Sequence, residues 1–367
     1  MSAQAGRSVS SLAAMGGLTF SERAVIAAIA VAAALAGVAR YGHWTPLLAF
    51  GLATLALAGL AHIVSLGTEQ VGQRLGPAAT GLLQSTLGNL PELFVVIFAL
   101  RAGEVVVAQT SIVGSLFANA LLVLGLVIVF GARSAPDGVM RFRQRLPNDT
   151  ATLLLVTSFI IVIVGLAHVT HEPAARHERA VSVIAAFALL VVYVAWVIPY
   201  VRGEAASEPT RHEAPRVALA VSITLLAVGG IGSAFVSDWF VAALRPTIDR
   251  LGVSEAFAGL VVVALAGNAV ENVAGVVLAH KGQYDLAVSV VKNSVAQVAA
   301  FLYPFLVIVS LLFDHQLTFA LTPVLIGALL VTALAMWQIT GDGEAVAFEG
   351  WALVAIYVIL ATFTLYD

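Results

Sequence analysis

The chain has 367 residues, of which 60% are hydrophobic and 11% are charged. This composition excludes an ordinary soluble domain, because so few polar side chains could not cover a globule of this length. The net charge of −3 includes no basic stripe or tail, so nothing supports a nucleic-acid partner. The absence of cysteine excludes disulfides, thiolate metal sites and cysteine nucleophiles. We therefore expect an integral membrane protein whose surroundings are the lipid bilayer.

Charge-sparse segments recur along the whole chain, each about twenty residues long and therefore able to cross a hydrocarbon layer of about 30 Å. They predict an all-α, polytopic fold of about eleven transmembrane helices, at residues 24–40, 44–67, 75–100, 105–131, 150–169, 180–201, 216–237, 255–279, 284–313, 316–340 and 345–365. The apolar run after Arg23 also leaves a secretory signal peptide as an alternative, but we favour a retained first helix.

Basic residues are distributed unequally between the two sides of the membrane. Cytoplasmic loops retain Lys and Arg during insertion, and eleven of the 18 basic residues fall on the side of the N-terminus, against six on the opposite side. The remaining one, Lys292, lies inside a predicted helix. We predict a cytoplasmic N-terminus and a location in the cell membrane.

The sequence contains an internal repeat. A shift of 179 positions superimposes Gly88-Asn-Leu-Pro-Glu92 on Gly267-Asn-Ala-Val-Glu271 and carries Ser115 onto Ser294. Five helices per copy is an odd number, so the second copy enters the membrane from the opposite side, as in transporters with inverted repeats. The predicted divisions are an N-terminal tail with one extra helix at 1–43, a first five-helix repeat at 44–201, a cytoplasmic linker at 202–215 and a second repeat at 216–367.

Two glutamates, Glu92 and Glu271, lie well inside predicted helices at equivalent positions of the repeat. An ionised carboxylate without a partner costs several kcal/mol within a bilayer, so such residues usually have a function. A buried structural glutamate, protonated or in a salt bridge, is the alternative. We predict that both glutamates bind a metal cation and protons.

Backbone and amide oxygens beside these glutamates would complete a cation site. Pro91 has no N–H for the carbonyl of Leu87, which is therefore freed close to Gly88. We add to the predicted site Leu87, Gly88 and Asn89 together with their counterparts Gly267 and Asn268. Carboxylate and carbonyl oxygens suit calcium, and a flexible site could also accept sodium. A helix kink or packing notch would explain the Gly-Asn pairs equally simply.

Two further helices carry an unusual number of polar residues for segments that face lipid. They should face the interior of the bundle, where single Ser or Gln residues also serve as interhelical hydrogen-bonding groups. The predicted binding residues here are Ser115, Asn119, Ser294 and Gln297, and the predicted relays or charge modulators are Gln109, Asn293, Lys292 and Glu69. Glu69 lies near a helix end and could equally be a solvated residue, and we place His168, His171 and Glu349 at the membrane interface.

At these residues the sequence resembles the calcium/proton exchanger family of the cation/calcium antiporter superfamily, over helices 2–11. The first signature is similar to Gly88–Glu92 followed by Ser111-Ile-Val-Gly-Ser115-Leu-Phe-Ala-Asn119, and the second to Gly267–Glu271 with Ser294 and Gln297. The segment Thr68-Glu69-Gln70 is similar to an acidic position before the first signature. The resemblance implies an eleven-helix antiporter in which the two glutamates bind calcium and protons in mutual exclusion.

The second signature departs from the family pattern at Asn272, where histidine is common, and at Lys292. Two carboxylates are neutralised by one calcium or two protons, whereas a charged lysine facing them would favour sodium or potassium. If Lys292 is uncharged or has another partner, calcium remains possible. We predict a Ca²⁺/H⁺ antiporter without enzymatic activity or cofactor, with a monovalent cation/H⁺ antiporter and, less favoured, a cation channel as alternatives. The oligomeric state stays open.

Overall fold

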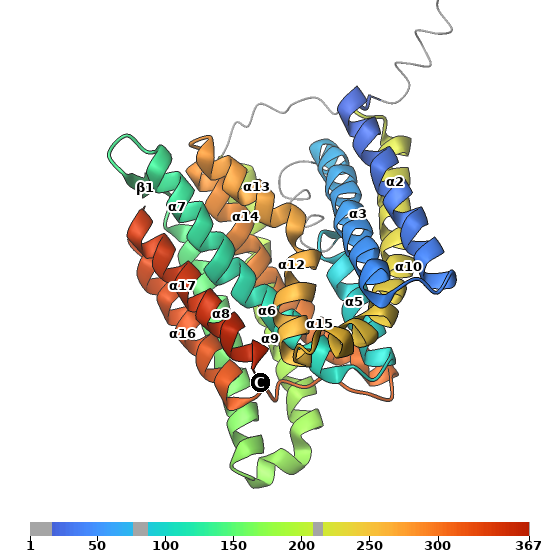
Figure 1. The fold of residues 1–367 in the computed structure, drawn as a ribbon. Coiled ribbons are helices and arrows are strands. Elements are labelled where there is room, and N and C mark those ends of the chain that lie inside the picture. The colour runs from blue at the N-terminus through green and yellow to red at the C-terminus, as the bar shows by residue number, and fades with distance from the viewer. Residues whose placement is uncertain (1–16, 76–86, 208–215, 367) are drawn as a thin grey trace, which may run out of the picture. The chain divides into compact units, whose positions relative to one another are not determined.

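The computed structural model describes residues 17–75, 87–207 and 216–366, except for a few side chains within helices. Its α-helices are α2 (Phe20–Tyr41), α3 (Pro46–Leu75), α5 (Leu90–Arg101), α6 (Val105–Phe117), α7 (Leu124–Ser134), α8 (Arg145–Val169), α9 (Glu178–Ser207), α10 (Leu219–Leu251), α11 (Glu255–Phe257), α12 (Ala264–Gly267), α13 (Ala269–His280), α14 (Tyr284–Gln297), α15 (Tyr303–Val309), α16 (Pro323–Thr340) and α17 (Ala347–Leu365). The π-helical segments are η1 (Ala118–Val123), η3 (Ala258–Val263) and η4 (Val298–Leu302); two 3-10 segments, η2 (Pro173–His177) and η5 (Ser310–Leu312), and two strands, β1 (Val139–Arg141) and β2 (Glu344–Val346), complete the structure (Figure 1).

The all-α membrane fold is confirmed. Within the described residues, nine helices are long and apolar enough to cross a bilayer, or ten if the bent pair Glu255–Gly267 and Asn272–His280 forms one span. Helices suit this environment because every backbone polar group is satisfied within the segment. The third predicted helix, 75–100, falls partly outside the described residues, so the count of eleven stays a prediction.

The repeat is visible in the backbone. Helices α5 and α13 begin and end at positions 179 residues apart, α6 and α14 begin at equivalent positions, and the π-helical segments η1 and η4 follow them. The turns between these helices also match, since Gly103 and Gly282 have φ angles of +83° and +75°. Glycine adopts this left-handed conformation without the steric cost that a Cβ would add.

The residues divide into two compact units, one of which consists of residues up to Pro91 and residues 197–244. In this unit α3 packs against α2 and α10. The rings of Phe50 in α3 and Phe240 in α10 lie 4.7 Å apart. Arg74 donates to the carbonyl of Val217 (2.5 Å), which ties the end of α3 to the segment before α10.

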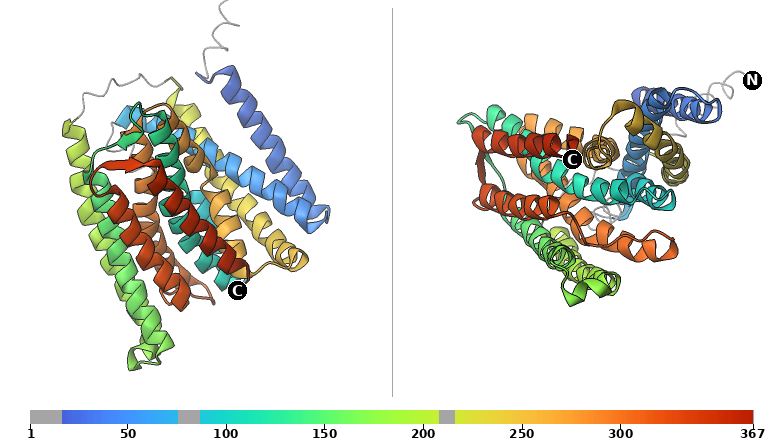
Figure 2. Two further views of the ribbon diagram at one scale, coloured as in Figure 1. Left: turned by 60° about the vertical axis from the view of Figure 1, so that its left-hand side comes forward. Right: turned by 60° about the horizontal axis from the view of Figure 1, so that its bottom comes forward.

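The second unit comprises residues 92–196 and 245–367 and contains most of both signatures. Here α16 packs along α8 and α17 along α7 (Figure 2). The strands β1 and β2 form one antiparallel pair that joins the connection after α7 to the connection after α16, with Met140 opposite Ala345. This pair was not predicted from the sequence, because three-residue strands are too short to show a recognisable alternation of apolar and polar residues.

Candidate functional site

Glu92 lies in the first turn of α5, directly after a turn formed by Gly88 and Asn89. Proline is tolerated at the start of a helix because the first N–H groups have no intrahelical acceptor, and this explains Pro91 as the second residue of α5. Glu92 is only 4% exposed. A helix N-terminus favours a negative charge, and the break in the helix places Glu92 at such a position.

The second signature repeats this break. Helix α12 ends at Gly267, the chain turns at Asn268, and α13 begins at Ala269. Glu271 occupies the first turn of α13, the equivalent of Glu92 in α5, although its side chain lies outside the described residues. A methyl group added at Gly267 would lie 3.8 Å from Cβ of Glu92. The backbone of the second signature therefore lies next to the side chain of Glu92.

A side-chain hydrogen bond also joins the two signatures. Asn268 Nδ2 donates to Ser115 Oγ (2.7 Å) and to the carbonyl of Ala264 (3.0 Å). Both partners are buried, at 3% and 0% exposure for Asn268 and Ser115. Because the amide nitrogen makes both bonds, the side-chain oxygen of Asn268 is the group left to accept from or coordinate a ligand.

Several side-chain oxygens of the signature helices are buried within the second unit. Asn119 Nδ2 donates to the carbonyl of Ser115 (3.0 Å). The oxygens Asn119 Oδ1, Ser294 Oγ and Asn272 Oδ1 have no hydrogen-bond partner among the described residues. Buried polar atoms are nearly always satisfied, so oxygens of this kind suit a ligand such as a hard cation. Gln297, on the same helix as Ser294, is buried as well.

Lys292 is completely buried on α14, and its nitrogen turns toward α16. Lys292 Nζ donates to Thr340 Oγ1 (3.0 Å), and that hydroxyl donates to the carbonyl of Met336 (2.6 Å). Among the described residues, no carboxylate lies within 4.0 Å of this nitrogen. Thr340 was not predicted as the partner of Lys292, because a single threonine at a helix end gives no sequence signal for such a role.

The remaining predicted residues lie in different surroundings. Gln109 Nε2 donates to the carbonyls of Thr318 (3.1 Å) and Ala320 (2.8 Å), at the end of α6 remote from Ser115. Asn293 is half-buried, and Glu69 is exposed on α3. The residues Leu87, Gly88 and Asn89 belong to the first unit, and of these Asn89 is buried.

Comparisons with known proteins are consistent with this geometry. A family model described as "Sodium/calcium exchanger protein" matches residues 45–199 and 221–366. The vacuolar calcium ion transporter of Schizosaccharomyces pombe is 31% identical over 333 residues, covering 88% of this chain and 80% of that protein. The Ca²⁺/H⁺ antiporter of a Synechocystis species is 30% identical over 339 residues, covering 87% of this chain and 91% of that protein.

Two solved structures resemble the fold. Native YfkE is 27% identical, with a TM-score of 0.78, and the match covers 94% of this chain and all of that one. The H⁺/Ca²⁺ exchanger CAX aligns with a TM-score of 0.74 over 95% of this chain and 93% of its own, and at 16% identity it supports the fold alone. The family resemblance drawn from the two signatures is confirmed.

Proposed function

Because the chain belongs to the sodium/calcium exchanger protein family, we propose that it is a secondary antiporter that exchanges Ca²⁺ for H⁺ across a membrane. Relatives named as a calcium ion transporter and a Ca²⁺/H⁺ antiporter support this choice of ions. The observation that carries the proposal is the meeting of the two signatures, where Gly267 lies beside Glu92 and Asn268 binds Ser115.

Glu92 and Glu271 are proposed to hold the transported ions. Two ionised carboxylates are neutralised either by one Ca²⁺ or by two protons, so one site can cross the membrane in either loaded form. The empty site carries two uncompensated charges, so the change of access costs more free energy when no cation or proton is bound. Mutual exclusion of calcium and protons then gives exchange rather than leak, since each ligand stabilises the occluded state.

The proposed ligands beside the carboxylates are neutral oxygens. Asn268 Oδ1, Asn119 Oδ1 and Ser294 Oγ offer such oxygens in the second unit, and Asn89 with the carbonyls of Leu87 and Gly88 is proposed to add more. Calcium accepts six to eight oxygens in flexible geometry, which suits a mixed set of carboxylates, amides and hydroxyls.

The direction of Lys292 favours calcium over a monovalent ion. A lysine ammonium facing the glutamates would leave only one negative charge to neutralise, but the nitrogen binds Thr340 instead. Without a lysine charge beside them, the two carboxylates carry two negative charges, which one divalent cation neutralises. The cytoplasmic N-terminus and the cell-membrane location remain predictions from the distribution of basic residues.

Calcium uptake into everted membrane vesicles with an imposed pH gradient tests the proposal. We expect saturable, gradient-dependent uptake that falls to background in Glu92→Gln and in Glu271→Gln, because each variant loses a charge and a proton-binding group. Glu172→Gln is the matched control, since Glu172 is exposed in the loop before η2, and it should transport normally. Sustained uptake in both signature variants would rule out the scheme, uptake of sodium or potassium in place of calcium would reassign the ion, and non-saturable flux without proton movement would indicate a channel.

A further inference from the structure

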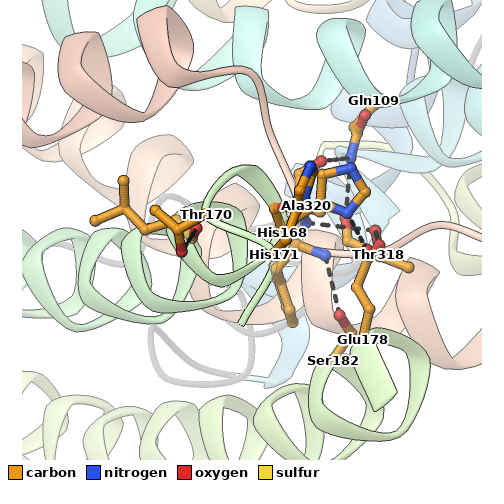
Figure 3. A network of polar contacts seen from close by, with 10 residues as sticks. Gln109, His168, Thr170, His171, Glu178, Ser182, Thr318 and Ala320 are labelled. Atoms are coloured by element: carbon orange, nitrogen blue, oxygen red, sulfur yellow. Dashed lines mark hydrogen bonds and ion pairs between the residues drawn. The ribbon is translucent and has the colours of Figure 1, made fainter. Parts of the chain in front are cut away.

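A polar network surrounds Thr318 in the connection between η5 and α16 (Figure 3). The carbonyl of Thr318 accepts hydrogen bonds from Gln109 Nε2 (3.1 Å) and from the hydroxyl of Tyr303 (2.9 Å). The ring of Tyr303 packs against Phe319, with 4.7 Å between centroids. One backbone carbonyl therefore joins two helices, α6 and α15, that are far apart in the sequence.

These are the helices that lead to the two equivalent serines. Gln109 lies on α6, which also carries Ser115. Tyr303 begins α15, which continues without interruption from α14 and η4 and thus from Ser294. A displacement of Thr318 would act on both helices, because its carbonyl is bonded to a side chain of each.

The side chain of Thr318 connects this tie to the protein surface. Thr318 Oγ1 donates to Glu178 Oε1 (2.6 Å), and the other carboxylate oxygen lies 2.7 Å from His168 Nδ1. The neighbouring Phe319 N donates to Ser182 Oγ (3.2 Å), so the start of α9 holds the connection at two points. The side chain of His168 is 61% exposed and that of Glu178 is 22% exposed, so the pair lies at the surface of the protein.

Histidine is the side chain whose charge ordinarily changes between pH 5 and 8. Proton uptake on the ring nitrogen that does not face Glu178 converts a hydrogen bond to the carboxylate into an ion pair and leaves the Nδ1 contact in place. His171 Nδ1 lies 3.1 Å from the carbonyl of His168. The other titratable or charged groups on the elements packed around the pair are Glu172, Arg176, His177, Arg179, Tyr303, Asp314 and His315.

We propose that His168 and Glu178 form a second proton-binding site, separate from the glutamates of the signatures, and that its protonation tightens the attachment of Thr318 to α6 and α15. A tighter attachment opposes the movement of these helices and slows the change of access. Protons on the face where α8 ends and α9 begins would then slow transport without taking part in the exchange itself.

The expected effect is moderate, because partly exposed ion pairs contribute about 0.2–1 kcal/mol, which corresponds to at most about a fivefold change. Equilibrium Ca²⁺–Ca²⁺ exchange in liposomes measures it, with the same pH on both sides between 5.5 and 8. The wild type should be about two- to fivefold slower than His168→Gln near pH 5.5, and the two should be equal at pH 8. His315→Gln is the matched control in the same connection and should follow the wild type throughout.

A ratio between the wild type and His168→Gln that stays constant with pH would overturn the proposal, since a merely structural histidine gives that result. If His168→Gln does not fold, Glu178→Gln replaces it, because the amide oxygen still accepts from Thr318 while the charge is lost.

The transport measurement rests on the proposed antiporter function. A second measurement tests the proton site independently of that function. Hydrogen exchange of residues 313–322, corrected for the intrinsic effect of pH, should be slower at pH 5.5 than at pH 8 in the wild type and in Glu92→Gln, but not in His168→Gln. This pattern in a protein that moves no calcium would retain the proton site and refute the antiporter, whereas its absence would refute the proton site alone.

Discussion

The two halves of the repeat share a backbone and differ in the side chains that it carries. Both run from a twelve-residue helix through a left-handed glycine turn into a second helix and a π-helical segment. Next to the equivalent serines, however, the first half has Val113 and Gly114 where the second has Lys292 and Asn293. Duplication thus preserves the path of the chain, while each half uses the same positions for a different purpose.

The segments that follow the two halves differ in the same way. Strand β1 pairs with β2 through its backbone, and Arg141 adds ion pairs to Asp137 (2.6 Å) and Glu344 (3.2 Å). A shift of 179 positions carries β1 onto Thr318–Ala320, which side chains of α6, α9 and α15 hold instead. Among the described residues, a histidine takes part in the second arrangement and not in the first, so the equivalent segments of the two halves should respond differently to pH.

The largest expected effect comes from exchanging Gly114 for its counterpart. A Cβ at Gly114 would overlap backbone atoms of Leu260 in η3, and one at Gly259 would overlap the hydroxyl of Thr110, so α6 and η3 touch at two glycines. Gly114→Asn should lower the free energy of unfolding by about 1–3 kcal/mol through overpacking against rigid backbone. The reciprocal Asn293→Gly should lower it by less than about 1 kcal/mol.

Thermal unfolding in detergent, followed by circular dichroism, compares these two variants. Gly327→Ala is a suitable control, because a Cβ at that glycine would meet no atom within 4 Å. Equal losses for Gly114→Asn and Asn293→Gly would show that the close approach of α6 to η3 does not distinguish the halves.

A smaller effect should separate the paired serines. Ser115→Ala removes one of the two acceptors for Asn268 Nδ2 and should lower the free energy of unfolding by about 0.5–1.5 kcal/mol, because the donor keeps its bond to the carbonyl of Ala264. Ser294→Ala removes a hydroxyl without a described partner, so stability should change by less than about 0.5 kcal/mol. If both oxygens coordinate calcium, both variants should need more Ca²⁺ for half-maximal uptake.

Denaturation and calcium titration of uptake must be measured on the same preparations. Loss of stability in Ser294→Ala equal to that in Ser115→Ala would indicate that the two serines have the same structural role. Unchanged calcium dependence in both variants would remove the serines from the proposed ligands.

Much of this fold was predictable because the bilayer allows few solutions. Hydropathy and the requirement for internal hydrogen bonding identified the helices. The breaks before Glu92 and Glu271 were not identified, because both were predicted inside continuous helices and a kink was only the alternative explanation for the Gly-Asn pairs. The bond between Asn268 and Ser115 was not predictable, because it depends on how two helices from different repeats cross. The π-helical segments η1, η3 and η4 were not predicted either, because one extra residue in a helical turn gives no recognisable pattern in an apolar sequence.

The orientation of the Lys292 side chain could not be predicted from the sequence either. It is the basis of the smallest predicted effect. Burying an amine away from the described carboxylates is costly, so the isosteric Lys292→Met should leave the free energy of unfolding unchanged or raise it by about 1 kcal/mol. Thr340→Val should be destabilising in the wild type, where it removes the partner of Nζ, but less so in the Lys292→Met background. Calcium uptake should persist in Lys292→Met with the same preference over sodium and potassium. Loss of uptake, or a change of ion, would instead place the lysine in the charge balance of the site, and the two halves would then differ in the chemistry of transport as well as in packing.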